Sequence, residues 1–254
     1  MPQNGSVTHT INDDISTIEF FHPKGNSLPG KLLGELTAAI KEASNSEDSK
    51  VIVIRSQGDG AFCAGASFDE MLAISDLEKG KKFFMGFANV LNAMRTSTKF
   101  IIARVQGKVV GGGVGIAACA DYTFAHTSAS VKLSELAVGI GPFVVGPAVG
   151  RKIGVGPFTT MSVDARSWYD SKWAENNNLY SQVLGSVEEI DKAIAKLAGE
   201  LSLSNPQAMK ELREIQWQGT GHWGSTLEQR AEISGRLILS EFSRKFIKKF
   251  KEKS

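Results

Sequence analysis

Two short runs of small residues could hold backbone amides against the carbonyl group of a ligand. The first run, AFCAGA at residues 61–66, follows an apolar segment, and the second, GGG at residues 111–113, follows another; each precedes a helix-like stretch. Catalysis at a carbonyl group needs hydrogen-bond donors at the oxygen that gains negative charge, and amides at helix starts supply them without side-chain movement. Small side chains also let a ligand approach the backbone closely. Since either run alone is compatible with ordinary close packing, the two must be considered together.

In their order and separation, the two runs resemble the two oxyanion motifs of the crotonase, or enoyl-CoA hydratase/isomerase, superfamily, and the resemblance covers nearly the whole chain. In that family the residue after Cys-Ala-Gly and the middle residue of Gly-Gly-Gly donate amides to the thioester oxygen of an acyl-coenzyme A. The resemblance assigns this role to Ala66 and Gly112, which would stabilise the enolate of the thioester. It also implies that the substrate is contacted by neighbouring residues, namely Cys63, Ala64, Gly65, Phe68, Gly111 and Gly113.

Glu135 is the candidate acid/base residue, because the family carries an acid/base glutamate at the place where this chain has ELAVGIGPF, residues 135–143. A carboxylate facing an acyl chain among apolar side chains would have a raised pKa and could exchange protons near neutrality. Pro142 and Phe143 are expected to line the same site. Without the resemblance, a surface glutamate at the end of a strand is the commoner explanation.

The position two residues after the glycine triplet bears on the reaction. Typical hydratases of the family carry a second glutamate there, so that two carboxylates hold the attacking water, whereas this chain has Gly115. One acid/base group suffices to move a proton along an enolate, so the sequence favours a Δ3,Δ2-enoyl-CoA isomerase. The string GIGPF, residues 139–143, also resembles the isomerases' Gly-Ile-x-Pro-Phe. Hydration by a water that other groups hold stays open.

Other branches of the superfamily fit less well. The dehalogenases need a nucleophilic aspartate at the position of Phe143. The dienoyl-CoA isomerases and naphthoate synthases want an aspartate near Pro142 or Phe143, and this chain has none there. These three branches are therefore disfavoured.

A nicotinamide-dependent oxidoreductase is an alternative from a different class. Gly113, Gly115 and Ala118 satisfy the G-x-G-x-x-G/A dinucleotide fingerprint, and Glu135 follows at about the distance expected of a ribose-binding acid. Against this reading, residues 106–110 intervene between the expected strand and the fingerprint, and the AFCAGA run would be left unexplained.

A third alternative is a non-catalytic acyl-CoA-binding homologue that has lost its chemistry together with the carboxylate at position 115. The presence of Glu135 argues against it. The four histidines form no metal-ligand pattern, so no metal is expected. No cofactor is expected either, since coenzyme A would be part of the substrate.

The elements that must position these residues alternate between strand and helix up to about residue 125. Apolar runs predict strands at residues 15–21, 51–56, 100–105 and 121–125, and helices are expected at 31–44, 83–94 and 115–120. Beyond residue 134 the pattern becomes helical, at residues 144–153, 187–202, 205–217 and 227–250.

No Gly/Ser-rich or Pro-rich linker separates these halves, so we expect an α/β fold in one structural domain, with a core at residues 1–190 and a helical C-terminal extension at 191–254. The resemblance implies a crotonase-like spiral of ββα units, with the C-terminal helices assembling a homotrimer or a dimer of trimers.

Composition restricts the partners. A net charge of +2 over 254 residues gives no global field for nucleic acid or a membrane surface. The first residues lack a signal sequence and no run approaches the roughly 20 apolar residues of a membrane span, so a cytoplasmic location is expected.

A basic cluster at the C-terminus offers candidates for the phosphates of coenzyme A, foremost Lys249. A solvated basic helix face is the commoner explanation of such a cluster. Its members are Arg244, Lys245, Lys248, Lys249, Lys251 and Lys253.

Overall fold

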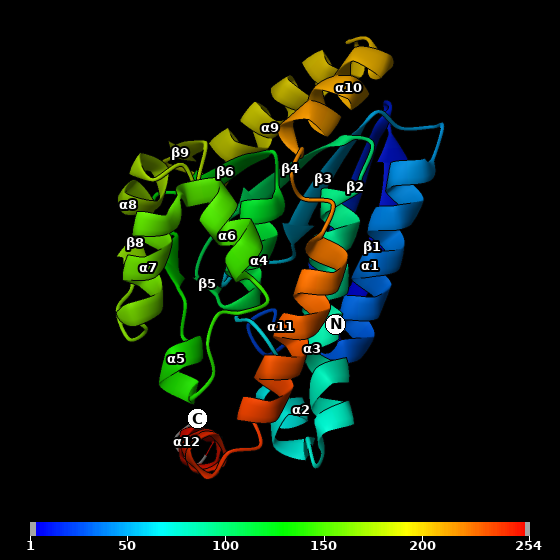
Figure 1. Ribbon diagram of the computed structural model, residues 1–254. Coiled ribbons are helices and arrows are strands. Elements are labelled where there is room, and N and C mark those ends of the chain that lie inside the picture. Colours follow the sequence, from blue (N-terminus) through cyan, green and yellow to red (C-terminus); the bar gives the residue numbers. More distant parts are fainter. Residues whose placement is uncertain (1–3, 252–254) are drawn as a thin grey trace.

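The computed structural model describes residues 4–251 of the chain (Figure 1). Its strands are β1 (Ser6–Asn12), β2 (Ile15–Phe21), β3 (Val51–Ser56), β4 (Phe100–Val105), β5 (Val109–Val110), β6 (Tyr122–His126), β7 (Ser130–Lys132), β8 (Tyr169–Asp170) and β9 (Gln182–Leu184). Its helices are α1 (Gly30–Asn45), α2 (Phe68–Ala73), α3 (Leu77–Arg95), α4 (Gly112–Cys119), α5 (Glu135–Val138), α6 (Gly146–Ile153), α7 (Val155–Val163), α8 (Ser171–Asn176), α9 (Val187–Ser202), α10 (Pro206–Gln216), α11 (Trp223–Leu237) and α12 (Glu241–Lys251).

The main sheet has the strand order β1-β2-β3-β4-β6-β9, and a smaller sheet has the order β5-β7-β8. In the main sheet β1 is antiparallel to β2, while every later pairing is parallel, so that Val51 lies opposite both Ile15 and Phe100. Because β3 and β4 are parallel neighbours, their carboxyl ends lie at the same edge of the sheet. The two small-residue runs follow these ends, and the topology therefore brings them together.

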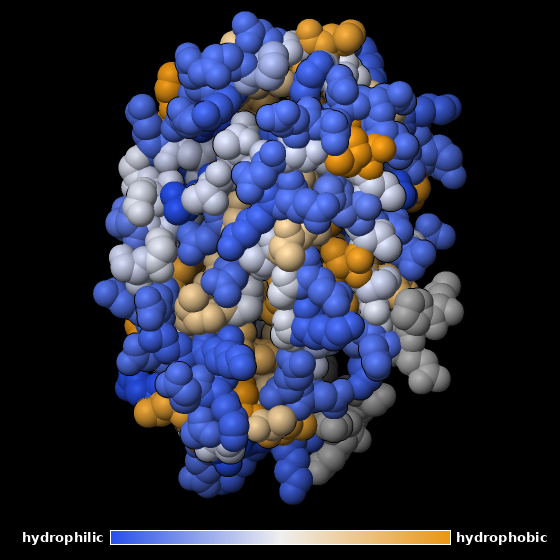
Figure 2. Space-filling model, turned by 90° about the vertical axis from the view of Figure 1, so that its right-hand side faces the viewer, coloured by the Kyte–Doolittle hydropathy of each residue, from blue (hydrophilic) through white to orange (hydrophobic). Residues whose placement is uncertain are grey.

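Both faces of the main sheet are covered, which explains the continuous apolar run of β3. Ile52 and Ile54 pack into the large core beneath α1, α3 and α4, while Val51 and Val53 face α9 in a second cluster. Figure 1 shows α1, α3 and α11 side by side, with α9 and α10 at the top of the view. The side of the molecule seen in Figure 2 is mainly hydrophilic, with hydrophobic residues in separate groups.

The predicted strands and most of the predicted helices are confirmed, but one predicted helix is broken in two, and several elements were not expected, namely β1, β5, β7, β8, β9, α5, α7 and α8. β1 was not expected, because its residues are mostly polar and it lies at the edge of the sheet. The single helix expected at residues 227–250 is wrong, because the chain breaks between α11 and α12. At the break the Ser243 amide donates to the Ser240 hydroxyl (3.3 Å) and the Ser243 hydroxyl donates to the Leu237 carbonyl (3.1 Å).

The expected boundary between core and extension, at residue 190, lies inside α9. The helical extension itself packs on the core, with α11 against α3 and α12 against α2 and α5. No helix within the described residues is long and apolar enough to cross a membrane.

Candidate active site

Glu135 is the first residue of α5, at the point where the chain leaves β7. The residue as a whole is half-buried, but its Oε2 atom is inaccessible to solvent and has no hydrogen-bond partner among the described residues. Burial raises the pKa of this carboxyl group to about 7, although the backbone amide of Glu135 itself acts in the opposite direction. Glu135 is therefore not an ordinary surface glutamate, and its carboxyl group can exchange protons near neutral pH.

Gly111 brings the carboxyl group of Glu135 against the start of α4. Its φ of +53° lies in the left-handed region, and a Cβ atom at this position would lie 3.1 Å from Glu135 Oε1. The Gly111 amide donates to the Lys132 carbonyl (2.9 Å), which ties the start of α4 to β7. The strand that leads into Glu135 therefore also fixes the position of the neighbouring Gly112 amide.

The loop with Ala66 is joined to the same region by backbone hydrogen bonds. Cys63 donates to Lys108 (3.3 Å) and accepts from Val110 (2.9 Å), so the loop lies alongside β5, directly before the glycine triplet. Gly65 has a φ of +88°, and a Cβ there would lie 3.1 Å from the Val110 carbonyl oxygen. Within residues 4–251 neither the Ala66 amide nor the Gly112 amide has a protein acceptor, so both can donate to a ligand.

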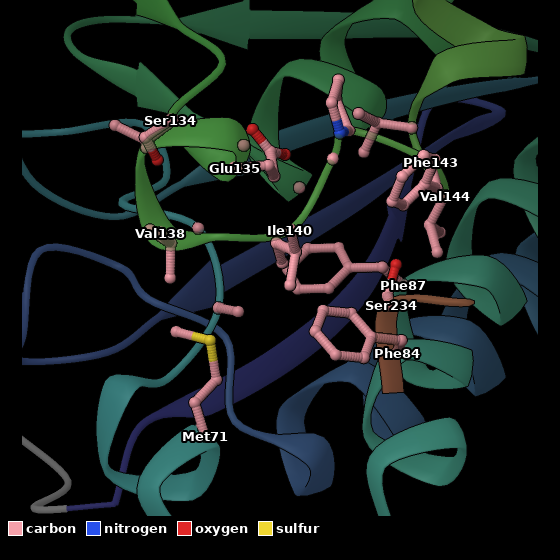
Figure 3. A pocket seen from close by; sticks show the side chains of 18 of the residues that line it. Met71, Phe84, Phe87, Ser134, Glu135, Val138, Ile140, Phe143, Val144 and Ser234 are labelled. Atoms are coloured by element: carbon pink, nitrogen blue, oxygen red, sulfur yellow. The ribbon is translucent and has the colours of Figure 1, made fainter. Parts of the chain in front are cut away.

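These groups open into one inner pocket that is otherwise apolar. Figure 3 shows the Glu135 carboxyl group pointing into it from α5, with Met71 of α2 and the rings of Phe84 and Phe87 of α3 further along its wall. The Phe87 ring lies directly on Gly112, where a Cβ would come within 2.1 Å of it. Ser234 of α11 also lines the pocket, beside Phe84 (Figure 3).

An outer pocket continues from the inner one and has a different character. The two share wall residues, namely Ala64, Ala66, Phe68, Val110, Ser134 and Val138. The outer pocket adds Trp168 and the cations Lys24, Lys132 and Arg166. Lys132 and Lys108 lie 5.1 and 5.2 Å from the centre of the Trp168 ring, and Lys24 pairs with Asp69. An apolar inner site thus opens into an aromatic and cationic outer one.

The structure brings together most of the residues that the sequence singled out. The inner pocket is lined by Ala64, Gly65, Ala66, Phe68, Gly111, Gly112, Glu135, Pro142 and Phe143. Cys63 and Gly113 lie behind this wall and pack on each other, since a Cβ at Gly113 would lie 2.7 Å from Cys63 Cβ. Lys249 is exposed on α12 and lines neither pocket, and Lys253 lies outside the described residues.

The sequence did not identify Ser234 or the cations around Trp168. Ser234 belongs to a helix far along the chain, and only the close crossing of α11 and α3 brings it to the pocket. A Cβ at Gly80 would lie 2.6 Å from the Gly235 carbonyl oxygen, so the two backbones touch beside Ser234. No glycine repeat within one helix signals this contact, because Gly80 of α3 and Gly235 of α11 each contribute to it singly.

The dinucleotide-binding alternative does not fit the structure. Gly113, Gly115 and Ala118 lie inside α4 and are buried, whereas a nucleotide loop must present its glycines to the ligand. A Cβ at Gly115 would lie 2.8 Å from Val145 Cγ1 and 3.3 Å from Leu91 Cδ2, so protein side chains fill the space beside it. No cluster of three or more acidic, histidine or cysteine side chains within residues 4–251 could hold a metal ion.

Known proteins similar to this chain identify its family. A family model described as enoyl-CoA hydratase/isomerase matches residues 10–254. The chain is 32% identical to the mitochondrial methylglutaconyl-CoA hydratase of Homo sapiens over 189 residues, which cover 73% of this chain and 55% of that protein. It is 24% identical to a probable enoyl-CoA hydratase of Bacillus subtilis over 253 residues, covering 98% and 96% of the two chains.

The match spans only 55% to 60% of the length of the human, mouse and rat methylglutaconyl-CoA hydratases. In fold, the structure is similar to an enoyl-CoA hydratase from Bacillus halodurans, with a TM-score of 0.88, 20% identity and coverage of 96% of this chain and 99% of that one. The expected crotonase-like α/β fold is therefore confirmed. With the family model matching nearly its full length, the chain belongs to the enoyl-CoA hydratase/isomerase family of the crotonase superfamily.

Proposed function

We propose that the chain is a Δ3,Δ2-enoyl-CoA isomerase, in which Glu135 is the acid/base residue and the amides of Ala66 and Gly112 hold the thioester oxygen. The observation that carries the proposal is the unpartnered, buried Oε2 atom of Glu135 beside the start of α4. A carboxyl group with a pKa of about 7 can both accept and return a proton at neutral pH.

In the proposed reaction the ionised Glu135 removes a proton from C2 of a 3-enoyl thioester. The electron pair of the broken C–H bond forms a C1–C2 double bond, and the carbonyl π pair moves onto the thioester oxygen. The amides of Ala66 and Gly112 stabilise that negative charge. The C3–C4 π pair then takes the proton from Glu135 and forms the new C4–H bond, which leaves the Glu135 carboxylate ionised again. The C1–C2 π pair becomes the C2–C3 double bond, and a pair on the thioester oxygen re-forms the carbonyl group. Substrate and product are isomers, so the proposed reaction consumes no cofactor.

Isomerisation is favoured over hydration by the rest of the inner pocket. Among the described residues that line it, Glu135 is the only one with a carboxyl group. The space beside Gly115 is filled by Val145 and Leu91, so a second carboxylate could not enter there without repacking. Hydration is the second candidate, because the similar proteins of Homo sapiens and Bacillus subtilis are named hydratases.

The outer pocket is suited to the coenzyme A part of the substrate. Its lysines and Arg166 can bind phosphate groups, and the half-exposed Trp168 ring adds an aromatic wall beside them. We further propose that the chain assembles as a homotrimer or a dimer of trimers, which light scattering on the purified protein would test.

The decisive experiment replaces the acid/base group. Glu135→Gln keeps the shape of the side chain but cannot take up a proton, so we expect kcat on 3-enoyl-CoA to fall by about 10²- to 10⁴-fold. Glu188→Gln, an exposed glutamate of α9, is the matched control and should retain activity. Full activity of Glu135→Gln on both 3-enoyl- and 2-enoyl-CoA would refute the assignment.

Assays of the unaltered protein with 3-enoyl-CoA and 2-enoyl-CoA separate the remaining alternatives. Conversion of 2-enoyl-CoA to a 3-hydroxyacyl-CoA, without a double-bond shift in 3-enoyl-CoA, would make the protein a hydratase. Binding of acyl-CoA without turnover of either substrate would identify a non-catalytic homologue.

A further inference from the structure

A separate cavity of about 350 Å³ lies between α6 and the start of α11. It shares no lining residue with the inner or outer pocket. Its positively charged groups are Arg151 from α6 and Arg230 from α11, and His222 stands directly before α11. None of the described residues that line this cavity is acidic.

Arg230 is half-buried without a counter-charge. Its Nη1 donates to the Phe143 carbonyl (3.2 Å), and no carboxylate in the described part of the chain forms an ion pair with it. Desolvation lowers the pKa of Arg230, with no charged group contributing. A guanidinium group has five N–H donors, so most of them remain available to a ligand.

Arg151 is exposed, and like Arg230 it forms no ion pair with a carboxylate in the described part of the chain. Its guanidinium group lies 4.0 Å from the centre of the Trp217 ring, and its Nη2 donates to the Gln216 carbonyl (2.5 Å). Asp121 is close enough to affect the pKa of Arg151, but it accepts hydrogen bonds from Arg213 Nε (2.8 Å) and Trp217 Nε1 (3.1 Å). The carboxylate that acts on Arg151 is thus already paired with another arginine, Arg213.

The first turn of α11 adds to the positive potential. Trp223 and Thr226 of this turn line the cavity, and no side chain caps the helix there. The positive end of a 15-residue helix therefore faces the same space as the two arginines.

We propose that this cavity binds an anion of the phosphate class, held by Arg151 and Arg230 with His222 at its edge. Guanidinium groups bind phosphate oxygens through paired hydrogen bonds, and an anion here would neutralise two cations that have no acidic partner. Since Arg230 also donates to the carbonyl of Phe143, the anion would lie one residue behind the wall of the inner pocket.

The test titrates inorganic phosphate into the full-length protein by calorimetry, with ionic strength held constant by sodium chloride. We expect saturable binding that weakens at least tenfold in Arg151→Gln and in Arg230→Gln. Arg236→Gln removes the same charge from an exposed position of α11 outside the cavity and should bind like the unaltered protein. Should Arg230→Gln not fold, as judged by circular dichroism, Arg151→Gln decides the question.

Free coenzyme A, added to the phosphate-saturated protein, distinguishes two sources of the anion. Displacement of phosphate would mean that a phosphoryl group of coenzyme A occupies the site, and independent binding would mean that the site takes a free anion. Either result supports a phosphate-class site. Absence of saturable binding, or equal affinity in both cavity variants and the control, would overturn the proposal.

Discussion

Burial of a single carboxyl group should make the activity depend on pH near neutrality. As the proposed base, Glu135 works only when it is ionised, and burial raises its pKa to about 7. We therefore predict that kcat/KM for 3-enoyl-CoA rises with pH up to about 7 and levels off above it. Initial rates between pH 5.5 and 8.5 measure this profile, and Glu188→Gln should leave it unchanged. A flat profile over this range would contradict the role of Glu135 as base.

The same pKa has a consequence for stability. The carboxyl group ionises at a pKa of about 7 in the folded chain and near 4.5 when unfolded, so the folded state holds its proton more tightly between these values. As pH rises through this window, the folded state is progressively destabilised, by up to about 3 kcal/mol above pH 7. We predict that Glu135→Gln is more stable than the unaltered protein at pH 8, with a much smaller difference at pH 4.5.

Urea unfolding of both proteins at the two pH values gives the free energies of unfolding. Glu188→Gln is again the control, because its side chain is exposed. An unchanged difference between pH 4.5 and pH 8 would mean that the Glu135 carboxyl group is solvated in the folded protein.

A single site residue could be predicted from the sequence where it stands in a motif of adjacent residues. Ala66, Gly112 and Glu135 stand in contiguous motifs, and the structure brings all three to one pocket. Ser234 carries no such signal, because its place at the pocket depends on how α11 crosses α3. Lys249 was a candidate because it belongs to a basic cluster, but the residue is exposed on α12 and lines neither pocket.

At the scale of elements, the crossing of α3 and α11 depends on one glycine in each helix. A Cβ at Gly235 would lie 2.5 Å from the Lys81 amide nitrogen and 2.6 Å from the Gly80 carbonyl carbon. Alanine favours a helix by about 1 kcal/mol over glycine, but a clash with backbone outweighs this gain. We predict that Gly235→Ala lowers the free energy of unfolding by about 2 kcal/mol.

Gly199→Ala in α9 is the matched control, because no atom outside the adjacent backbone of α9 lies within 4 Å of the position that its Cβ would take. It should stabilise the protein by about 0.5 to 1 kcal/mol. Equal midpoints of urea unfolding for the two variants would show that the crossing tolerates a side chain.

Elements could be predicted where a local pattern decides them. The buried strand β3 is a continuous apolar run and α3 has a clear amphipathic period, and both were expected. β1 has mostly polar residues and pairs only with β2, so its strand form depends on a neighbour. The break between α11 and α12 depends on hydrogen bonds of the Ser240 and Ser243 hydroxyl groups. The apolar pattern from which the helix was predicted gives no indication of these bonds.

At the scale of the whole molecule, the last helix returns to the site that the first half of the chain builds. α12 packs against α2 and α5, the helices that follow Ala66 and contain Glu135 (Figure 1). Phe246 of α12 lines the outer pocket together with residues as distant in sequence as Lys24 and Trp168. The proposed coenzyme A site is thus complete only when the C-terminal helix has docked.

Docking of α12 should therefore affect binding of the substrate more than its chemistry. Phe246→Ala removes an aromatic wall from the outer pocket but leaves Glu135 and both amides in place. We predict that KM for an enoyl-CoA rises about tenfold, while kcat changes less than twofold, because loss of uniform binding leaves the chemical step unaltered. Phe242→Ala removes the same ring from the same helix at a 61% exposed position that lines neither pocket, and its KM should stay unchanged. A fall in kcat with constant KM in Phe246→Ala would instead indicate that α12 acts on the position of Glu135.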